Sequence, residues 1–185
     1  MKRPPEPLQT AEAKELVRCA RAGRKKATAI RDAAAVAVMW RSHLRISELL
    51  GLRFEDYETD RLRVLHGKGA KHRVVGCDEG TQALINAWVV VRPESEYLFC
   101  TMKGTAVDAS HYRRLMKRLQ NSAEIVKRCH PHGMRHTGAM ELAKERVPLP
   151  FIAAQLGHSN VSTTDEYLRH ISGQEIVDVV SKRQW

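Results

Sequence analysis

Six side chains, spread over five short segments of the sequence, could together attack a phosphodiester. Arginine, lysine and histidine can bind phosphate oxygens or protonate them, and a tyrosine hydroxyl can act as a nucleophile. The six residues are Arg45, Lys68, His132, Arg135, His158 and Tyr167. Phosphoryl transfer depends on positioning and charge stabilisation, so this set suits it if the fold brings the segments together.

The segment HPHGMRH supplies a histidine and an arginine at helical spacing. Pro131 suits the first position of a helix, where its missing N–H costs nothing. His132, Arg135 and His136 then lie at i, i+3 and i+4, on one face near the positive end of the helix. Such a helix start favours a phosphate, and the alternative is a surface helix with incidental histidines.

Zinc is another possible ligand of this segment. Four potential zinc ligands lie close together in the sequence: Cys129, His130, His132 and His136. Their spacing does not match a Cys/His zinc pattern, and no second cysteine is near. We therefore expect neither a metal ion nor another cofactor, and a zinc-stabilised nucleic-acid module is the alternative.

Arg45 stands between Leu44 and Ile46, and an arginine in an apolar setting is costly unless it meets an anion. That anion could be a substrate phosphate, which a guanidinium grips with two hydrogen bonds, or it could be Glu48. Lys68 lies between two glycines at a predicted turn. It does not belong to a P-loop, and taken alone it is most simply a solvated lysine.

His158 and Tyr167 are nine positions apart. A short helix after His158 would bring the tyrosine back beside the histidine. The alternative is a tyrosine with its ring in the core and its hydroxyl hydrogen-bonded, which is common in proteins.

The pattern of apolar residues predicts a mainly α-helical domain with one small antiparallel β-sheet, an α+β fold. Thr10 is the expected N-cap of the first helix, and the second is apolar around most of its circumference, which indicates deep burial. The predicted strands 61–66 and 72–77 flank a Gly-Lys-Gly turn. The predicted helices are 11–22, 28–42, 79–91, 109–121, 132–146, 149–156, 162–170 and 173–182.

The net charge of +10, from 31 basic and 21 acidic residues, favours a polyanionic partner such as nucleic acid. The basic residues expected to contact DNA are Lys71, His72, Arg73, Arg24, Lys25 and Lys26. The four cysteines form no C-x-x-C pair, and neither a signal peptide nor a membrane-length apolar run is present. We expect a cytoplasmic protein with free thiols and no membrane contact.

Taken in order, these segments resemble the tyrosine recombinase (phage integrase) family. The matching stretches are LRISELLGLRFED, GKGAKHR, HPHGMRHTGAMELA and QLGHSNVSTTDEYLRH. The resemblance implies the family's catalytic-domain fold, and DNA breakage and rejoining through a 3′-phosphotyrosine without metal or ATP. One departure is His43, because the family usually has glycine at that place.

The resemblance also implies a role for each of the six side chains. The expected roles are nucleophile for Tyr167, clamps on the non-bridging oxygens for Arg45 and Arg135, a further hydrogen-bond donor for His158, base for His132, and acid for the leaving 5′-oxygen for Lys68.

We expect a lead-in at 1–8, the catalytic domain at 9–170 and a C-terminal segment at 171–185. That segment could pack on its own domain or dock on a neighbouring protomer. Because the homology starts near residue 8, the chain resembles minimal family members without N-terminal arm- and core-binding domains, or an excised fragment. The expected partners are double-stranded DNA with core-type attachment sites, further copies in a tetramer, and a host or phage accessory or directionality factor. The expected location is the bacterial nucleoid or a phage-infected cell.

Other functions use similar residues. Integration, inversion and resolution share one catalytic set and differ in their DNA sites and accessory proteins. A topoisomerase would relax supercoils by the same chemistry, and a catalytically silent regulator would only bind DNA. The presence of Tyr167 with both arginines favours an active enzyme, and the compact domain favours an integrase.

Overall fold

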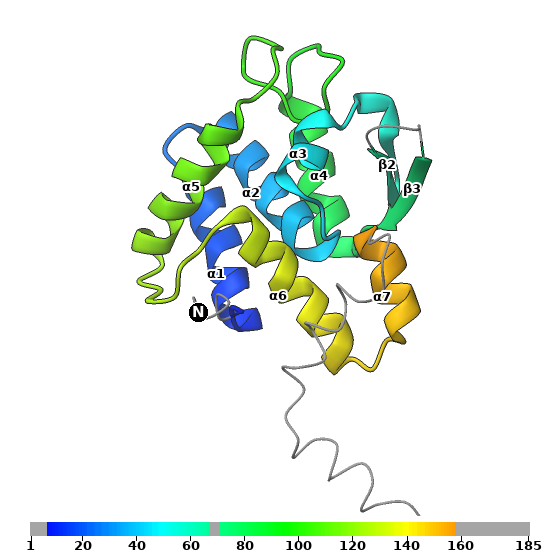
Figure 1. Ribbon diagram of the computed structural model, residues 1–185. Coiled ribbons are helices and arrows are strands. Elements are labelled where there is room, and N and C mark those ends of the chain that lie inside the picture. Colours follow the sequence, from blue (N-terminus) through cyan, green and yellow to red (C-terminus); the bar gives the residue numbers. More distant parts are fainter. Residues whose placement is uncertain (1–6, 67–70, 158–185) are drawn as a thin grey trace, which may run out of the picture.

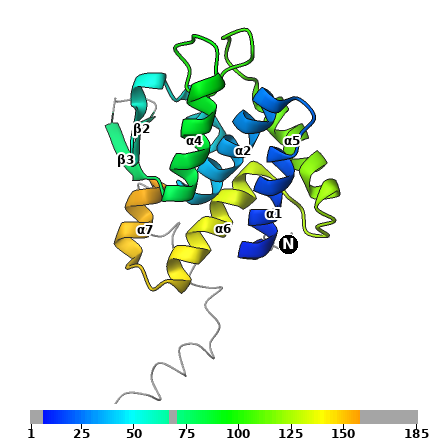
Figure 2. The same ribbon diagram turned by 180° about the vertical axis from the view of Figure 1, so that it is seen from behind.

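The computed structural model describes residues 7–66 and 71–157. Helices form most of this part, and a small sheet lies at one edge (Figures 1 and 2). The helical elements are α1 (Thr10–Arg21), α2 (Lys26–Arg41), α3 (Ile46–Gly51), the short 3-10 helix η1 (Phe54–Asp56), α4 (Glu79–Val91), α5 (Ala109–Ser122), α6 (Pro131–Lys144) and α7 (Leu149–Leu156). The strands are β1 (Tyr57–Glu58), β2 (Arg61–His66) and β3 (Lys71–Gly76), which pair antiparallel in that order. The predicted fold class is confirmed.

The centre of the fold is α2, which packs against α1, α4 and α6. Its consecutive residues from Ala33 to Met39 are all buried, as the apolar circumference predicted. A run of small alanines allows neighbouring helices to approach closely, which suits a helix that is covered on every side. The prediction of deep burial for this helix is confirmed.

Close contact with α2 fixes the position of α6. A Cβ atom added at Gly138 would lie 2.0 Å from the carbonyl oxygen of Trp40. One helical turn further on, Glu141 accepts hydrogen bonds from Trp40 Nε1 at 2.9 Å and Arg41 Nη1 at 2.8 Å. Because α6 carries two predicted catalytic residues at its start, this contact also fixes where they lie.

The prediction that Thr10 caps the first helix is wrong. The helix begins at Thr10 itself, and the N-cap is Gln9, whose backbone N–H donates to Glu12 Oε2 at 2.6 Å. The Thr10 hydroxyl instead donates to Glu141 Oε1 at 2.7 Å. A contact between helices therefore competes with the local cap and replaces it.

The hairpin of β2 and β3 lies beside α7, and Leu62 pairs with Val75 across it. Both of these side chains are buried, so one face of the hairpin joins the core. The turn at 67–70 lies outside the described residues, as do the predicted helices at 162–170 and 173–182. In the part of the chain that is described, no helix is both long and apolar enough to cross a membrane.

Candidate active site

The carboxylate of Glu48 joins two of the predicted catalytic arginines. Its Oε1 accepts a hydrogen bond from Arg45 Nη1 at 2.8 Å, and its Oε2 lies 3.4 Å from Arg135 Nη1. Glu48 also accepts the backbone N–H of Arg45 at 2.7 Å, which caps the start of α3. The structure therefore shows the Arg45–Glu48 pair that the sequence left as an alternative, and it brings Arg135 to the same carboxylate.

Three parts of the fold hold the guanidinium of Arg135. This side chain is 1% exposed, and Nη1 donates to the carbonyl oxygen of His43 at 2.7 Å. Its Nη2 donates to the carbonyl oxygen of Leu156, the last residue of α7, at 2.6 Å. A buried guanidinium with a carboxylate and two carbonyl acceptors is well compensated, so its position is tightly specified.

His43 stands where the family usually has glycine, and it adopts a backbone conformation that glycine favours. Its φ is 59°, in the left-handed region, where histidine is more frequent than most other side chains. The residue is 3% exposed, and burial lowers its pKa to about 4. The ring is therefore neutral near pH 7.

Arg73 points towards the same carboxylate. Its Nη1 donates to Glu48 Oε1 and its Nη2 donates to Glu48 Oε2, both at 2.9 Å. Its Nε donates to the Gln155 carbonyl oxygen at 3.3 Å. The side chain is 13% exposed. The DNA contact expected for Arg73 stays a prediction, but the guanidinium is directed at Glu48 and not outward.

Several cations around Glu48 keep its carboxyl group ionised. Burial opposes ionisation, but the hydrogen bonds from Arg73 and from the Arg45 backbone outweigh it and lower the pKa of Glu48 to about 2. From the sequence, Glu48 was predicted only as a possible partner for Arg45. Its spacing three residues after Arg45 indicates a capping box, but nothing in the sequence indicates contacts with Arg73 and Arg135.

His132 lies in the first turn of α6 and lines a pocket of about 640 Å³. The pocket is also lined by Arg113 and Lys117 of α5, and by Ile46, the residue after Arg45. The rings of His130 and His132 are stacked, with centroids 6.4 Å apart. The predicted base and the residue next to the first arginine therefore line the same pocket, and its lining includes cationic side chains.

The structure gives the zinc interpretation no support. His130 Nδ1 accepts the backbone N–H of Gly133 at 3.1 Å, which caps α6. Within residues 7–66 and 71–157, no group of three or more His, Cys, Asp or Glu side chains is arranged to hold a metal ion.

Three of the six predicted catalytic residues lie outside the described residues: Lys68, His158 and Tyr167. The segments that lead to two of them are described. The strands β2 and β3 lead to the turn with Lys68, and α7 ends at the residue before Gly157. Because α7 packs against β3, these two segments lie side by side.

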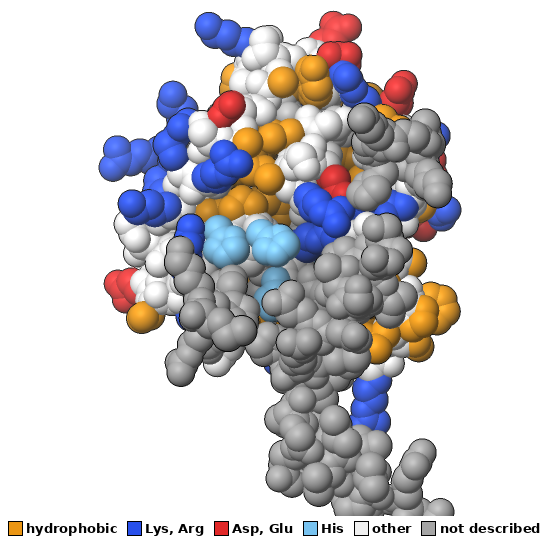
Figure 3. Space-filling view, viewed as in Figure 1, with side chains coloured by type: hydrophobic (Ala, Val, Ile, Leu, Met, Phe, Trp, Pro, Cys, Tyr) orange, Lys and Arg blue, Asp and Glu red, His pale blue; other side chains and the backbone are white. Residues whose placement is uncertain are grey.

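A basic surface adjoins the pocket with His132. Exposed lysine and arginine side chains gather over α5 in Figure 3, with histidine side chains near the middle of the same face. Those of α5 are Arg113, Arg114, Lys117 and Arg118. They are not among the predicted DNA contacts, although their spacing places them on one side of a helix. The predicted DNA contacts Arg24, Lys25 and Lys26 are exposed before and at the start of α2, whereas Lys71 and His72 lie in β3.

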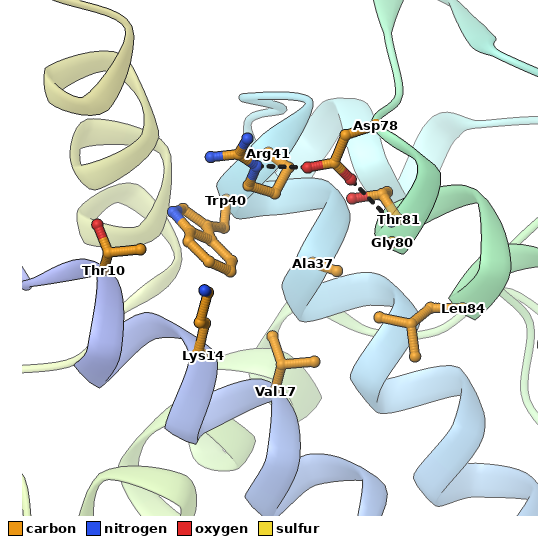
Figure 4. A pocket seen from close by; sticks show the side chains of 10 residues that line it. All are labelled: Thr10, Lys14, Val17, Ala37, Trp40, Arg41, Asp78, Gly80, Thr81 and Leu84. Atoms are coloured by element: carbon orange, nitrogen blue, oxygen red, sulfur yellow. Dashed lines mark hydrogen bonds and ion pairs between the residues drawn. The ribbon is translucent and has the colours of Figure 1, made fainter. Parts of the chain in front are cut away.

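A second pocket, of about 450 Å³, lies between α1, α2 and α4 (Figure 4). Its lining includes Trp40, Leu84 and Lys14, together with Arg41, which is paired with Asp78 at 2.6 Å. None of the predicted catalytic residues lines it, so we assign it no chemistry.

Comparison with known proteins identifies the family. A family model described as the phage integrase family matches residues 7–173. The tyrosine recombinase XerC of Corynebacterium glutamicum is 32% identical over 161 residues, which cover 83% of this chain and 51% of the relative. XerC of Haemophilus influenzae is 34% identical over 159 residues, which cover 81% of this chain and 52% of the relative.

Solved structures agree with this result. The crystal structure of the XerA recombinase matches 100% of this chain and 68% of that chain, with a TM-score of 0.85 and 26% identity. The XerH recombinase bound to a palindromic difH substrate matches 96% of this chain and 53% of that chain, with a TM-score of 0.79 and 23% identity. The chain therefore belongs to the phage integrase family and has the fold of a tyrosine recombinase catalytic domain. It spans about half the length of the curated relatives it matches.

Proposed function

We propose that the chain is the catalytic part of a site-specific DNA recombinase, an integrase that cleaves and rejoins DNA through a 3′-phosphotyrosine. The observation that carries this proposal is the meeting of Arg45 and Arg135 at Glu48. Two guanidinium groups held by one carboxylate are fixed in advance, so they can stabilise charge on a phosphate without reorganising. Family membership supports the same conclusion.

The proposed chemistry needs neither metal nor ATP. Tyr167 Oη attacks the scissile phosphorus, a phosphotyrosine bond forms, and the bond to the 5′-oxygen breaks. His132 takes the proton of the tyrosine, and Lys68 gives a proton to the leaving oxygen. Because tyrosine has a reference pKa near 10, it needs such assistance at neutral pH. In the reverse step, a 5′-hydroxyl attacks the phosphotyrosine and releases Tyr167.

Charge stabilisation is the task of the two arginines and of His158. The side chain of Arg45 is 36% exposed, so it can meet a phosphate at the surface while Glu48 holds its other side. Each preorganised donor to the developing charge is worth a factor of about 100 to 1,000 in rate. Loss of either arginine should therefore slow cleavage far more than it weakens DNA binding.

Duplex DNA with core-type attachment sites is the proposed partner. The exposed cations of α5 beside the pocket with His132, and those near the start of α2, support a polyanionic ligand. One solved neighbour is bound to a difH substrate, and the Tn1549 transposon integrase is in complex with circular intermediate DNA. We further propose assembly of four copies on DNA, help from an accessory or directionality factor, and a cytoplasmic location.

A covalent-trapping assay tests this proposal. The protein is incubated with nicked duplexes from its own genetic neighbourhood in the presence of a chelator, and the reaction is quenched with detergent. We expect a protein–DNA adduct for the natural chain and none for Tyr167→Phe. Binding without any adduct would instead indicate a catalytically silent DNA-binding regulator.

A further inference from the structure

Arg73 contacts two other segments of the site at once. It lies on β3, five positions after Lys68. Its guanidinium donates two hydrogen bonds of 2.9 Å to Glu48 on α3, and a third of 3.3 Å to the carbonyl oxygen of Gln155 on α7. One planar group thus joins the hairpin, the start of α3 and the end of α7.

The end of α7 packs directly on this guanidinium. Gly157 ends the helix with a φ of 61°, and a Cβ atom there would lie 2.9 Å from the Cδ, Nε and Cζ atoms of Arg73. Contacts below 3.0 Å are essentially never seen for a real Cβ atom, so a side chain at residue 157 would displace Arg73 from this position. The next residue in the sequence is His158.

We propose that Arg73 is a positioning residue. It fixes the relative positions of three parts of the site: the strand that follows Lys68, the end of α7 before His158, and the carboxylate that the two clamp arginines share. This inference rests on the proposed function, because those four residues carry it. The contacts of Arg73 with Glu48 fix the carboxylate that Arg45 and Arg135 share. Its contacts with Gln155 and Gly157 fix the chain just before His158, and its own strand carries the turn with Lys68.

Arginine has the shape that this task needs. A guanidinium can place two parallel N–H groups on both oxygens of one carboxylate and still donate through Nε. A lysine ammonium is a compact point charge without that fixed fork, so Arg73→Lys keeps the charge but not the three directed contacts. The direction of the hydrogen bonds, and not only the charge, should therefore decide the rate.

The test compares cleavage with binding on the same nicked duplex from the protein's genetic neighbourhood. Arg73→Met and Arg73→Lys are measured beside a matched control, Arg61→Met, on the neighbouring strand. The side chain of Arg61 is 49% exposed and pairs with Asp60. Both Arg61→Met and Arg73→Met remove one charge from the hairpin.

We expect Arg73→Met to lower the single-turnover cleavage rate about 100-fold, as for a misplacement of about 1 Å at the site. Its dissociation constant should stay within about threefold of that of the control. Arg73→Lys should remain at least about tenfold slow. Cleavage equal to the control, or cleavage and affinity falling in parallel, would overturn the proposal.

Hydrogen exchange of the whole chain separates this proposal from the proposed function. If the natural chain forms no adduct, the proposed function fails. Hydrogen exchange still tests whether Arg73 holds β3 and α7 together. Arg73→Met should then lower amide protection in β3 and α7 together, whereas Arg61→Met should not change α7. Unchanged protection of α7 in Arg73→Met would overturn the positioning role whatever the adduct assay shows.

Discussion

Arg135 Nη1 donates a hydrogen bond of 2.7 Å to the carbonyl oxygen of His43, whose backbone has a φ of 59°. This left-handed turn directs the carbonyl at the buried guanidinium. The His43 ring lies against α6, since a Cβ added at Gly138 would be 2.7 Å from His43 Nε2. The other ring nitrogen, His43 Nδ1, lies 3.4 Å from Gln155 Nε2. His43 therefore contributes its backbone to the site and its ring to the packing around it.

Two substitutions of His43 separate backbone strain from side-chain packing. Both His43→Gly and His43→Ala remove the ring, but only alanine keeps a Cβ at positive φ. We expect His43→Ala to be less stable than His43→Gly by about 1 kcal/mol. Urea unfolding of the two variants measures this difference, and equal free energies of unfolding would mean that the turn stores no strain.

Glu48→Gln tests the shared carboxylate. The substitution keeps the size of the side chain but removes the charge that holds Arg45, Arg73 and Arg135. Breaking a buried ion pair on one side costs about 3–5 kcal/mol, so we expect a large loss of stability. In the fraction that stays folded, cleavage should be slowed about 100-fold, because the arginines lose their common anchor.

Glu55→Gln is the matched control for Glu48→Gln, because Glu55 is exposed on η1 nearby. We expect its free energy of unfolding to lie within about 0.5 kcal/mol of the natural chain. If Glu48→Gln unfolded and cleaved like Glu55→Gln, Glu48 would not organise the site.

Acid should destabilise the protein in two stages. The pKa of His43 is about 4 when folded, below its ordinary value of 6.5, so unfolding binds a proton and stability falls as the pH drops from 6.5 towards 4. The pKa of Glu48 is about 2, below its ordinary value of 4.5, so its stabilising contribution is lost as the pH drops from 4.5 towards 2. Each group contributes a slope of at most about 1.4 kcal/mol per pH unit.

Urea midpoints measured between pH 7 and pH 3 check this order. In His43→Gly, the loss of stability between pH 6.5 and 4 that the histidine ring causes should disappear. The loss of stability below pH 4.5 that Glu48 causes should remain. A variant profile parallel to that of the natural chain down to pH 4 would show that the His43 ring does not titrate as described.

Gly138→Ala should be severely destabilising. The added Cβ would lie 2.0 Å from the Trp40 carbonyl oxygen, so α2 and α6 must separate. Overpacking of this kind costs about 1–3 kcal/mol and occasionally more, and a clash with backbone belongs at the upper end. Because α6 carries His132 and Arg135, cleavage should fall as well.

Gly51→Ala is the control for Gly138→Ala. Nothing lies within 4 Å of a Cβ at Gly51, the last residue of α3, so alanine should be neutral or stabilise by up to about 1 kcal/mol. Thermal melting compares the two variants, and similar melting temperatures would contradict the close packing of α2 on α6.

Much of the fold follows from local patterns in the sequence. Periodicity and turn residues predicted the hairpin, the buried second helix and the helix that starts at Pro131, and the structure has all three. The spacing of His132 and Arg135 also follows from helical geometry alone. These features depend on neighbouring residues, so a single sequence reveals them.

The connections within the site could not be predicted in the same way. Glu48 and Arg73 are 25 positions apart, and Glu48 and Arg135 are 87 apart, so only the packing of whole elements brings them together. The inward direction of Arg73 and the loss of the Thr10 cap have the same origin. In each case a contact between elements decides where a polar side chain points.

The chemical identity of the protein–DNA link tests whether Tyr167 is the nucleophile of the proposed cleavage reaction. The adduct trapped in the presence of a chelator is digested with nuclease and protease, and the modified peptide is identified by mass spectrometry. We expect a phosphotyrosine at Tyr167 joined to a DNA 3′ end, with a free 5′-hydroxyl on the other fragment. A link through another residue, or to a 5′ end, would contradict this prediction.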